Sequence, residues 1–493
     1  MSLARNTLII FLMRISNLGL MMVGPILVAR LLSVQEFGLY REFLVYTSLF
    51  TPIAAFCFSQ ALQYFVPTYP GHVWQLVRQT VLLTALASAT VGAVVGMADW
   101  LLHGQILGTA GLRVLLYTAL CVNVDFWEFY WLAEQRPTSA FAYTSGRLIS
   151  RLLTVIVTAA LSHNVQTIFT ALMLLEAARI MLALIAWRLL RRREARKPGG
   201  LWAAQLRYCV PLGVALIMGT FNNNIGSVLI ARMISAAALA QYTVATYAVP
   251  VMYMLRNSLS DALLPHMARA HAGRGGTPSL ELWHRSNTLF AILLIPITVL
   301  MARYAELIVV TLFSERYLPA VLPFQVSLIS IVTLTVDFGV AFRLLGQTTA
   351  FLRSNIIGTV INVGLLIVLL PRFGMYGAIA ALTLDELAVR IYLGQELARQ
   401  TSATLSSVLG LRALGRVLLA ALAALPLLAL HSSHGWRHIP LAALSSLAYL
   451  AGFTALLWLV GTSEVRQLLS EGYARITVAL RRGHWRRSSE RMP

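Results

Sequence analysis

Charged residues stand inside apolar segments of this chain, at spacings that place their side chains on one face of a helix. The segment VDFWEF carries Asp125 and Glu128 three residues apart, and the segment SGRLISRLL carries Arg147 and Arg151 four residues apart. Guanidinium groups bind phosphate through fixed forks of N–H donors, and a neighbouring carboxylate can neutralise a guanidinium or carry a proton or a sodium ion. These residue types predict either buried ion pairs or a wet site for an anionic ligand.

The same residue types recur in further apolar segments. They form the combinations Glu176 with Arg179, Asp337 with Arg343, and Asp385 and Glu386 with Arg390, whereas Arg14 has no acid on its own segment. We expect the ligand to contact Arg14, Arg147, Arg151, Arg179, Arg343 and Asn223. We expect ion pairs, or sites for a coupling proton or sodium ion, at Asp125, Glu128, Glu176, Asp337, Asp385, Glu386 and Arg390, with Asp125 and Glu176 as the leading coupling residues.

Each of these assignments has a structural alternative. An isolated charge at the centre of a bilayer costs at least about 2.5 to 3.5 kcal/mol, so the charged residues could simply neutralise one another. Arg14, and with it Arg343 and Arg390 near helix ends, could extend to the lipid headgroups. The run Asn222–Asn224 could bind another helix instead of a ligand.

The composition is that of a membrane protein. Hydrophobic residues make up 58% of the 493 residues and charged residues 12%, with a mean hydropathy of +0.73. Soluble domains contain about 45 to 50% apolar and about 25% charged residues. The three cysteines lie in apolar segments at spacings that match no metal site, so we expect neither a disulfide nor a metal centre.

Runs of about 20 apolar residues, the length that crosses a hydrocarbon core about 30 Å thick, predict transmembrane helices. Fourteen such runs occur, the first six near residues 8–32, 38–66, 75–98, 110–133, 139–161 and 165–190. The next six lie near 207–232, 237–264, 284–313, 319–345, 353–370 and 374–396, and the last two near 412–431 and 439–461.

Basic residues between the predicted spans account for most of the net charge of +20. The segment RLLRRREARKPGG follows the sixth span, and the C-terminal tail is also basic, whereas the loops 99–108 and 162–166 contain no Lys or Arg. Because basic loops remain in the cytoplasm, both termini are predicted to be cytoplasmic. This placement explains the charge without a nucleic-acid partner, and we expect none.

Two segments of the chain resemble each other. LVARLLSVQEFGLY (27–40) and LIARMISAAALAQY (229–242) share Ala, Arg, Ser and Tyr at one constant offset (229 − 27 = 202). Since six crossings return the chain to its starting side, we interpret this as a parallel repeat, with Arg30 and Arg232 at equivalent outer ends of two six-helix lobes. The predicted organisation is an N-terminal lobe (1–190), a basic cytoplasmic linker (191–206), a second lobe (207–396), two extra transmembrane helices (397–461) and a basic cytoplasmic tail (462–493).

The hairpin LLSVQEFGLY and the segment NVGLLIVLLPRFGMYGAIAA (362–381) resemble the polysaccharide-transporter family of the multidrug, oligosaccharidyl-lipid and polysaccharide (MOP) exporter superfamily. The resemblance implies a V-shaped all-α membrane protein with two six-helix bundles. It also implies a flippase that moves an undecaprenyl-pyrophosphate-linked sugar repeat unit across the bacterial inner membrane by alternating access, for O-antigen or exopolysaccharide assembly. The partners would be this lipid-linked oligosaccharide, membrane lipids and other polysaccharide-assembly proteins, and the chain would act as a monomer without a cofactor.

Other functions compete with this interpretation. A lipid-linked peptidoglycan precursor has the same charge as the expected cargo, and a multidrug extruder would share the fold, although cationic drugs favour an acidic cavity. A membrane polymerase or ligase usually needs a large external loop, and the external loops predicted here are short. The sequence also lacks the HExxH, P-loop and GxSxG motifs. We therefore expect no enzymatic activity.

Overall fold

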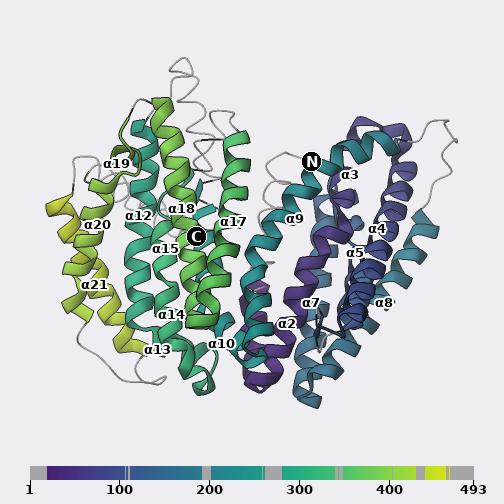
Figure 1. Ribbon diagram of the computed structural model, residues 1–493, viewed down its shortest axis with the longest axis horizontal. Coiled ribbons are helices and arrows are strands. Elements are labelled where there is room, and N and C mark those ends of the chain that lie inside the picture. The colour runs from purple at the N-terminus through teal and green to yellow at the C-terminus, as the bar shows by residue number, and fades with distance from the viewer. Residues whose placement is uncertain are drawn as a thin grey trace, which may run out of the picture. The chain divides into compact units, whose positions relative to one another are not determined.

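The computed structural model of the chain describes residues 19–190, 201–260, 280–338, 342, 348–428, 439–461 and 466, apart from positions 21, 106, 109, 110, 258 and 402. Throughout this part of the chain the regular structure consists of α-helices and short 3₁₀ helices, with no strand (Figure 1). The predicted all-α fold class is confirmed.

Ten helical segments within the described ranges are long and apolar enough to cross a membrane. They are Val34–Thr68, Val73–Leu101, Pro137–Ser162, Val165–Ala186, Trp202–Met233, Trp283–Arg303, Glu315–Thr333, Arg353–Phe373, Leu411–Leu428 and Ile439–Val460. The chain is therefore a multi-pass membrane protein. The total of fourteen stays a prediction, because the spans expected near 8–32, 237–264 and 319–345 extend into residues outside the described ranges.

Contacts within the chain define two compact units. The first comprises Met1–Thr243, Leu312–Tyr317 and Leu366–Ala378, and the second comprises Val244–Thr311, Leu318–Leu365 and Ile379–Pro493. The first unit thus includes residues 207–243, which the repeat pattern assigns to the second lobe. The domain boundaries expected from the sequence stay predictions, and most of the basic linker, residues 191–200, lies outside the described part of the chain.

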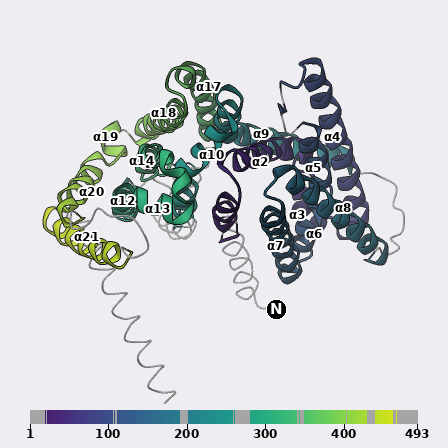
Figure 2. The same ribbon diagram turned by 90° about the horizontal axis from the view of Figure 1, so that it is seen from below.

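The helices of the first unit run along the chain in the order expected for successive spans. They are α2 (Val34–Ala55), α3 (Phe58–Thr68), η1 (Pro70–His72), α4 (Val73–Leu101), α5 (Leu112–Val122), α6 (Phe126–Ala133), α7 (Pro137–Ser162), α8 (Val165–Leu190), α9 (Trp202–Met233) and most of α10 (Ala236–Ala245). Helix α6 packs between α3 and α7 (Figure 2). An aromatic core that includes Phe58, Phe126, Trp127 and Tyr130 fills the space among these helices.

Two of the predicted spans are interrupted. Helices α2 and α3 are separated at Phe56 and Cys57, both with left-handed backbone angles (φ 41° and 61°). Helices α5 and α6 are separated by three turn residues, Asn123 to Asp125. Average hydropathy predicts neither break, because apolar residues flank both and a membrane tolerates irregular backbone where side chains satisfy it.

The repeated segments adopt the same local structure. The hydroxyl of Ser33 accepts a hydrogen bond from the backbone N–H of Glu36 (3.1 Å) at the start of α2. The hydroxyl of Ser235 accepts one from the backbone N–H of Ala238 (3.0 Å) at the start of α10. The two donors are separated by the offset of the repeat (238 − 36 = 202). The shared serines therefore serve as equivalent helix N-caps.

The second unit contains the last helices of the chain. Its elements are the end of α10, α12 (Leu280–Arg303), α13 (Ala305–Leu312), η3 (Glu315–Ala320), α14 (Val321–Ser327), α15 (Ile329–Thr333), α17 (Thr348–Phe373), α18 (Met375–Thr401), α19 (Leu405–Val408), α20 (Leu411–Ala423), η4 (Leu425–Leu428) and α21 (Ile439–Val460), of which α13, η3, α17 and α18 are shared with the first unit. Helices α20 and α21 pack together and against α12 (Figure 1). Their shared core includes Ile295, Val417, Tyr449 and Phe453.

Candidate functional site

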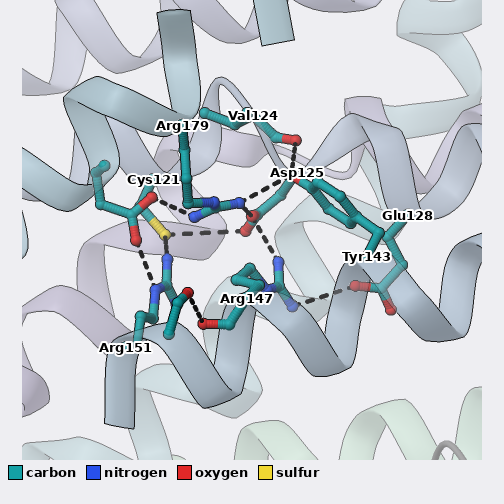
Figure 3. Close-up of polar contacts among 10 residues, drawn as sticks. Cys121, Val124, Asp125, Glu128, Tyr143, Arg147, Arg151 and Arg179 are labelled. Carbon is teal, nitrogen blue, oxygen red and sulfur yellow. Dashed lines mark hydrogen bonds and ion pairs between the residues drawn. The ribbon is translucent and has the colours of Figure 1, made fainter. Parts of the chain in front are cut away.

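Arg147 holds two carboxylates at once in the first unit (Figure 3). Its Nη1 lies 2.5 Å from Oδ1 of Asp125, and its Nη2 lies 3.1 Å from Oε2 of Glu128. The sequence predicts these three residues as a group, and in the structure they form two ion pairs. Because Asp125 and Glu128 use different nitrogens, one guanidinium satisfies both acids.

A second pair of arginines shares one buried carboxylate. Nε of Arg151 lies 2.6 Å from Oε1 of Glu176, and Nη1 of Arg179 contacts the other oxygen of Glu176. Nη2 of Arg179 also lies 3.6 Å from Oδ1 of Asp125. The two groups are therefore joined into one network of three arginines and three acids, named here the six-charge network. Arg151 pairs with Glu176 and not with the acids of the preceding span.

The break between α5 and α6 and the regularity of α7 place these charges. Asp125 is the last turn residue before α6, so its side chain projects from an interrupted helix. Tyr143, Arg147 and Arg151 follow at four-residue intervals on α7 and share one face of it. Helix α8 packs against α7 and supplies Glu176 and Arg179 one turn apart.

Two residues that the sequence analysis did not select support the network. The hydroxyl of Tyr143 donates to the carbonyl of Val124 in the break (2.7 Å) and accepts from Nη2 of Arg179 (2.8 Å). Nη2 of Arg151 lies 2.7 Å from Sγ of Cys121. The four-residue spacing of Tyr143 and Arg147 is a signal that could have found the tyrosine; no local pattern marks Cys121.

Burial differs across the six-charge network. The side chain of Glu176 is 0% exposed, whereas that of Asp125 is 23% exposed. Three positive and three negative groups balance, as expected for charges held in a medium of low dielectric constant. Glu176 is therefore positioned as a fixed anchor between two arginines, and Asp125 as the acid most open to exchange. This arrangement is compatible with a purely structural role and with a binding site.

A second buried cluster lies in the second unit, around Asp337. Nη1 of Arg256 lies 3.4 Å from its Oδ1, the hydroxyl of Ser260 donates to its Oδ2, and its backbone N–H donates to Oδ1 of Asn287 (3.2 Å). Arg256 was not among the predicted site residues, although it is an arginine within a predicted span. The expected partner Arg343 has a side chain outside the described part of the structure.

The acids of α18 are also placed in the second unit. Oε2 of Glu386 lies 3.6 Å from Nη2 of Arg390 and accepts from the hydroxyl of Thr333 (2.6 Å). Nη1 of Arg390 donates to the carbonyl of Val336 (3.0 Å), so this arginine reaches a neighbouring segment and not the headgroups. Asp385 is buried, 3% exposed, on the side of α18 that faces α17.

Of the remaining predicted ligand contacts, the structure describes Asn223 but not Arg14. Asn223 is exposed on α9. Its neighbour Asn224 accepts a hydrogen bond from Ser48 on α2 (2.9 Å), so part of the asparagine run binds another helix. Arg14 lies outside the described residues. Over the described ranges, no group of three or more His, Cys, Asp or Glu side chains could hold a metal ion.

Comparison with known proteins identifies the family and the fold. Residues 3–271, more than half of the chain, match the family of polysaccharide biosynthesis proteins. The structure is similar to the lipid II flippase MurJ in an inward closed conformation, with a TM-score of 0.67 and 12% sequence identity over 92% of this chain and 99% of that chain. No curated protein matches the chain in sequence.

The fold also resembles a multidrug transporter. The inward-facing conformation of a multidrug resistance MATE family transporter of the MOP superfamily has a TM-score of 0.55 and 13% identity over 78% of this chain and 94% of that chain. Identities this low compare folds and not substrates. The chain belongs to the polysaccharide biosynthesis protein family, and its fold is similar to the folds of MurJ and of the MATE transporter.

Proposed function

We propose that this protein is a flippase that moves an undecaprenyl-pyrophosphate-linked oligosaccharide repeat unit across the bacterial inner membrane by alternating access. The six-charge network carries this proposal, because it gathers three guanidinium groups inside an apolar helical unit of a polysaccharide biosynthesis protein. Arginine forks suit the several oxygens of a pyrophosphate better than a point charge does. The product of such transport would serve O-antigen or exopolysaccharide assembly.

In this proposal the pyrophosphate replaces carboxylates as the partner of the arginines. Arg147 is the first contact, because Asp125 and Glu128, its two acids, are both partly exposed. Arg151 and Arg179 stay in place through Glu176, which is fully buried between them. Arg14, Arg343 and Asn223 are further proposed contacts along the route of the cargo.

Charge balance favours coupling to a cation. The six-charge network is neutral, so a pyrophosphate that enters it brings uncompensated negative charge into a region of low dielectric constant. A proton or a sodium ion on a displaced acid would restore the balance. Asp125 suits this role better than Glu176, because Glu176 keeps two arginine partners.

Proteins with this fold could carry two other kinds of cargo. A lipid-linked peptidoglycan precursor is the second candidate, because MurJ, whose fold is similar, is a lipid II flippase. A cationic drug is less suited to a network with as many arginines as acids. The direct test is complementation of flippase-deficient strains that make defined lipid-linked glycans. Rescue by a single glycan class identifies the cargo, and rescue of none argues against the flippase proposal.

A mutant cycle separates binding from a structural clasp. Arg147→Ala leaves Asp125 and Glu128 without their main partner, so we expect a loss of stability of about 3 to 5 kcal/mol and reduced membrane abundance. The combined change of Asp125, Glu128 and Arg147 to Ala removes the unpaired charges and should restore abundance. If Arg147 binds phosphate, this triple variant stays inactive.

The readouts of the cycle are membrane abundance and translocation of repeat units. Arg399→Ala is the control, because Arg399 pairs with Glu396 at 3.9 Å on an exposed surface. That variant should change neither readout, since exposed pairs contribute little. Full translocation by the triple variant would reject the binding role of Arg147 and favour the clasp.

A further inference from the structure

Arg41 differs from five other buried or part-buried arginines of the helices. Arg147, Arg151, Arg179, Arg256 and Arg390 each lie within 4 Å of a carboxylate. Among the described residues no carboxylate lies that close to Arg41, whose Nε donates to Oγ1 of Thr243 at 3.3 Å. Its two terminal nitrogens form no hydrogen bond with any described residue. The fork end of this guanidinium is therefore available to an anion.

The Arg41 side chain contacts α10 at the position equivalent to its own. Arg41 follows the N-cap Ser33 by eight residues, and Thr243 follows the equivalent N-cap Ser235 by eight residues (41 − 33 = 8; 243 − 235 = 8). Both side chains thus start about 12 Å along their helices from equivalent caps. Arg41 reaches sideways, from the first repeat to the same level of the second.

Helix α2, which carries Arg41, is linked to the six-charge network through its other side. The guanidinium of Arg151 lies over the ring of Tyr117, 5.7 Å from its centre. The ring of Tyr117 packs on Phe43 with 5.1 Å between their centres, and Phe43 stands two residues after Arg41 on α2. Phe43 is fully buried towards α5, so Arg41 projects from another side of α2, which its bond to Thr243 identifies as the side of the second repeat.

We propose that Arg41 forms a second anion site, at which the phosphate group of the lipid-linked cargo binds on its way between the six-charge network and the hairpin end of α2. This inference rests on the proposed flippase function. A membrane-embedded charge without a counter-ion is costly and marks a functional site by default. Arg41 supplies the positive charge that the neutral six-charge network lacks, on the side of α2 that contacts α10.

The competing role for Arg41 is a brace that only holds α2 to α10 through Thr243. Two substitutions separate the roles. Arg41→Gln keeps an N–H donor for Thr243 and removes the charge, whereas Thr243→Val removes the acceptor and keeps the charge. A brace predicts an effect of Thr243→Val and little effect of Arg41→Gln, and an anion site predicts an effect of Arg41→Gln alone.

The measurement is binding of farnesyl pyrophosphate to the purified full-length protein in detergent. We expect Arg41→Gln to weaken binding about tenfold or more, the loss of a charge-assisted hydrogen bond, while Thr243→Val stays within about twofold. Equal binding by Arg41→Gln and wild type would overturn the inference, as would equal weakening by both variants. Failure of the wild-type protein to bind would instead overturn the proposed function.

Two further measurements complete the test. Phosphatidylglycerol should not compete with farnesyl pyrophosphate; competition that depends on Arg41 would identify a general phospholipid site and overturn the role in cargo transfer. Should Arg41→Gln not fold, the wild-type protein still gives an answer. Farnesyl pyrophosphate should protect Arg41 from modification by phenylglyoxal, detected by mass spectrometry, and unprotected modification would contradict the inference.

Discussion

Tyr143 connects the backbone of an interrupted helix to a charged side chain. Its hydroxyl donates to the carbonyl of Val124 and accepts from Arg179, so one oxygen joins a backbone carbonyl of the break to an arginine of the six-charge network. The ring also lies 5.7 Å from the guanidinium carbon of Arg179. Tyr143 therefore sets the orientation of an arginine that also contacts Asp125 and Glu176.

Loss of this hydroxyl tests whether orientation matters for transport. We expect Tyr143→Phe to reduce repeat-unit translocation several-fold and to cost about 1 kcal/mol of stability, the usual contribution of one hydrogen bond. Tyr449→Phe is the matched control, because the hydroxyl of Tyr449 donates to the carbonyl of Ala421 at 3.2 Å without a charged neighbour in that bond. Similar translocation by the two variants would show that Tyr143 is only structural.

The six-charge network shows which contacts a sequence predicts. Asp125, Glu128 and Arg147 could be grouped in advance, because helical spacing and a short connection bring them together. The bond of Arg151 to Glu176 could not, since it depends on how α7 rotates against α8. The pairing of Asp337 with Arg256 is equally non-local, and it joins residues 81 positions apart (337 − 256 = 81).

A glycine allows two helices of the first unit to approach closely. A Cβ at Gly38 on α2 would overlap the backbone carbonyl of Ala236 at the start of α10. On α4, a Cβ at Gly92 would meet nothing within 4 Å. Both glycines lie within apolar helices, but only Gly38 is required for close packing against another helix.

These glycines give a matched pair of substitutions. Gly38→Ala should destabilise the protein by about 1 to 3 kcal/mol, because the backbones must separate. Gly92→Ala should stabilise it by about 0.5 to 1 kcal/mol through its higher helix propensity. Thermal unfolding in detergent measures both changes. A stable Gly38→Ala protein would mean that α2 and α10 do not pack as closely as described.

The sequence predicts where some helices begin and end better than it predicts breaks within a span. The expected spans 139–161 and 439–461 agree closely with α7 and α21, because their apolar runs are bounded by polar loops. The breaks at Phe56–Cys57 and at Asn123–Asp125 were missed. Their backbone groups are satisfied by specific side chains such as Tyr143, and average hydropathy does not register such contacts.

At the scale of the whole molecule, the placement of basic loops predicts how the chain crosses the bilayer. The charge pattern assigns the segment around Gly199 to the cytoplasm and the loop at His103 to the outer side. Position 199 lies outside the described residues, whereas His103 is exposed after α4. The proposed cytoplasmic termini depend on the same rule.

Single cysteines at these two positions test the orientation in intact cells. Cysteine at His103 should react with a membrane-impermeant maleimide added from outside, and cysteine at Gly199 should react only after the cells are opened. The native Cys57, Cys121 and Cys209 are buried and should stay unlabelled in both cases. Labelling of position 199 from outside intact cells would contradict both the predicted topology and the interpretation of the repeat as parallel.

The equivalent helix caps at Ser33 and Ser235 bear on how the chain evolved. Two segments that fold alike at a fixed offset are what an internal duplication leaves behind, and duplicated halves begin with identical residues at matching positions. Arg41 and Thr243 are such matching positions, and they touch. Two arginines at positions 41 and 243 would repel each other, and two threonines would provide no positive charge. The contact therefore required the two copies to diverge, so symmetry had to be lost at this point before the pair could form.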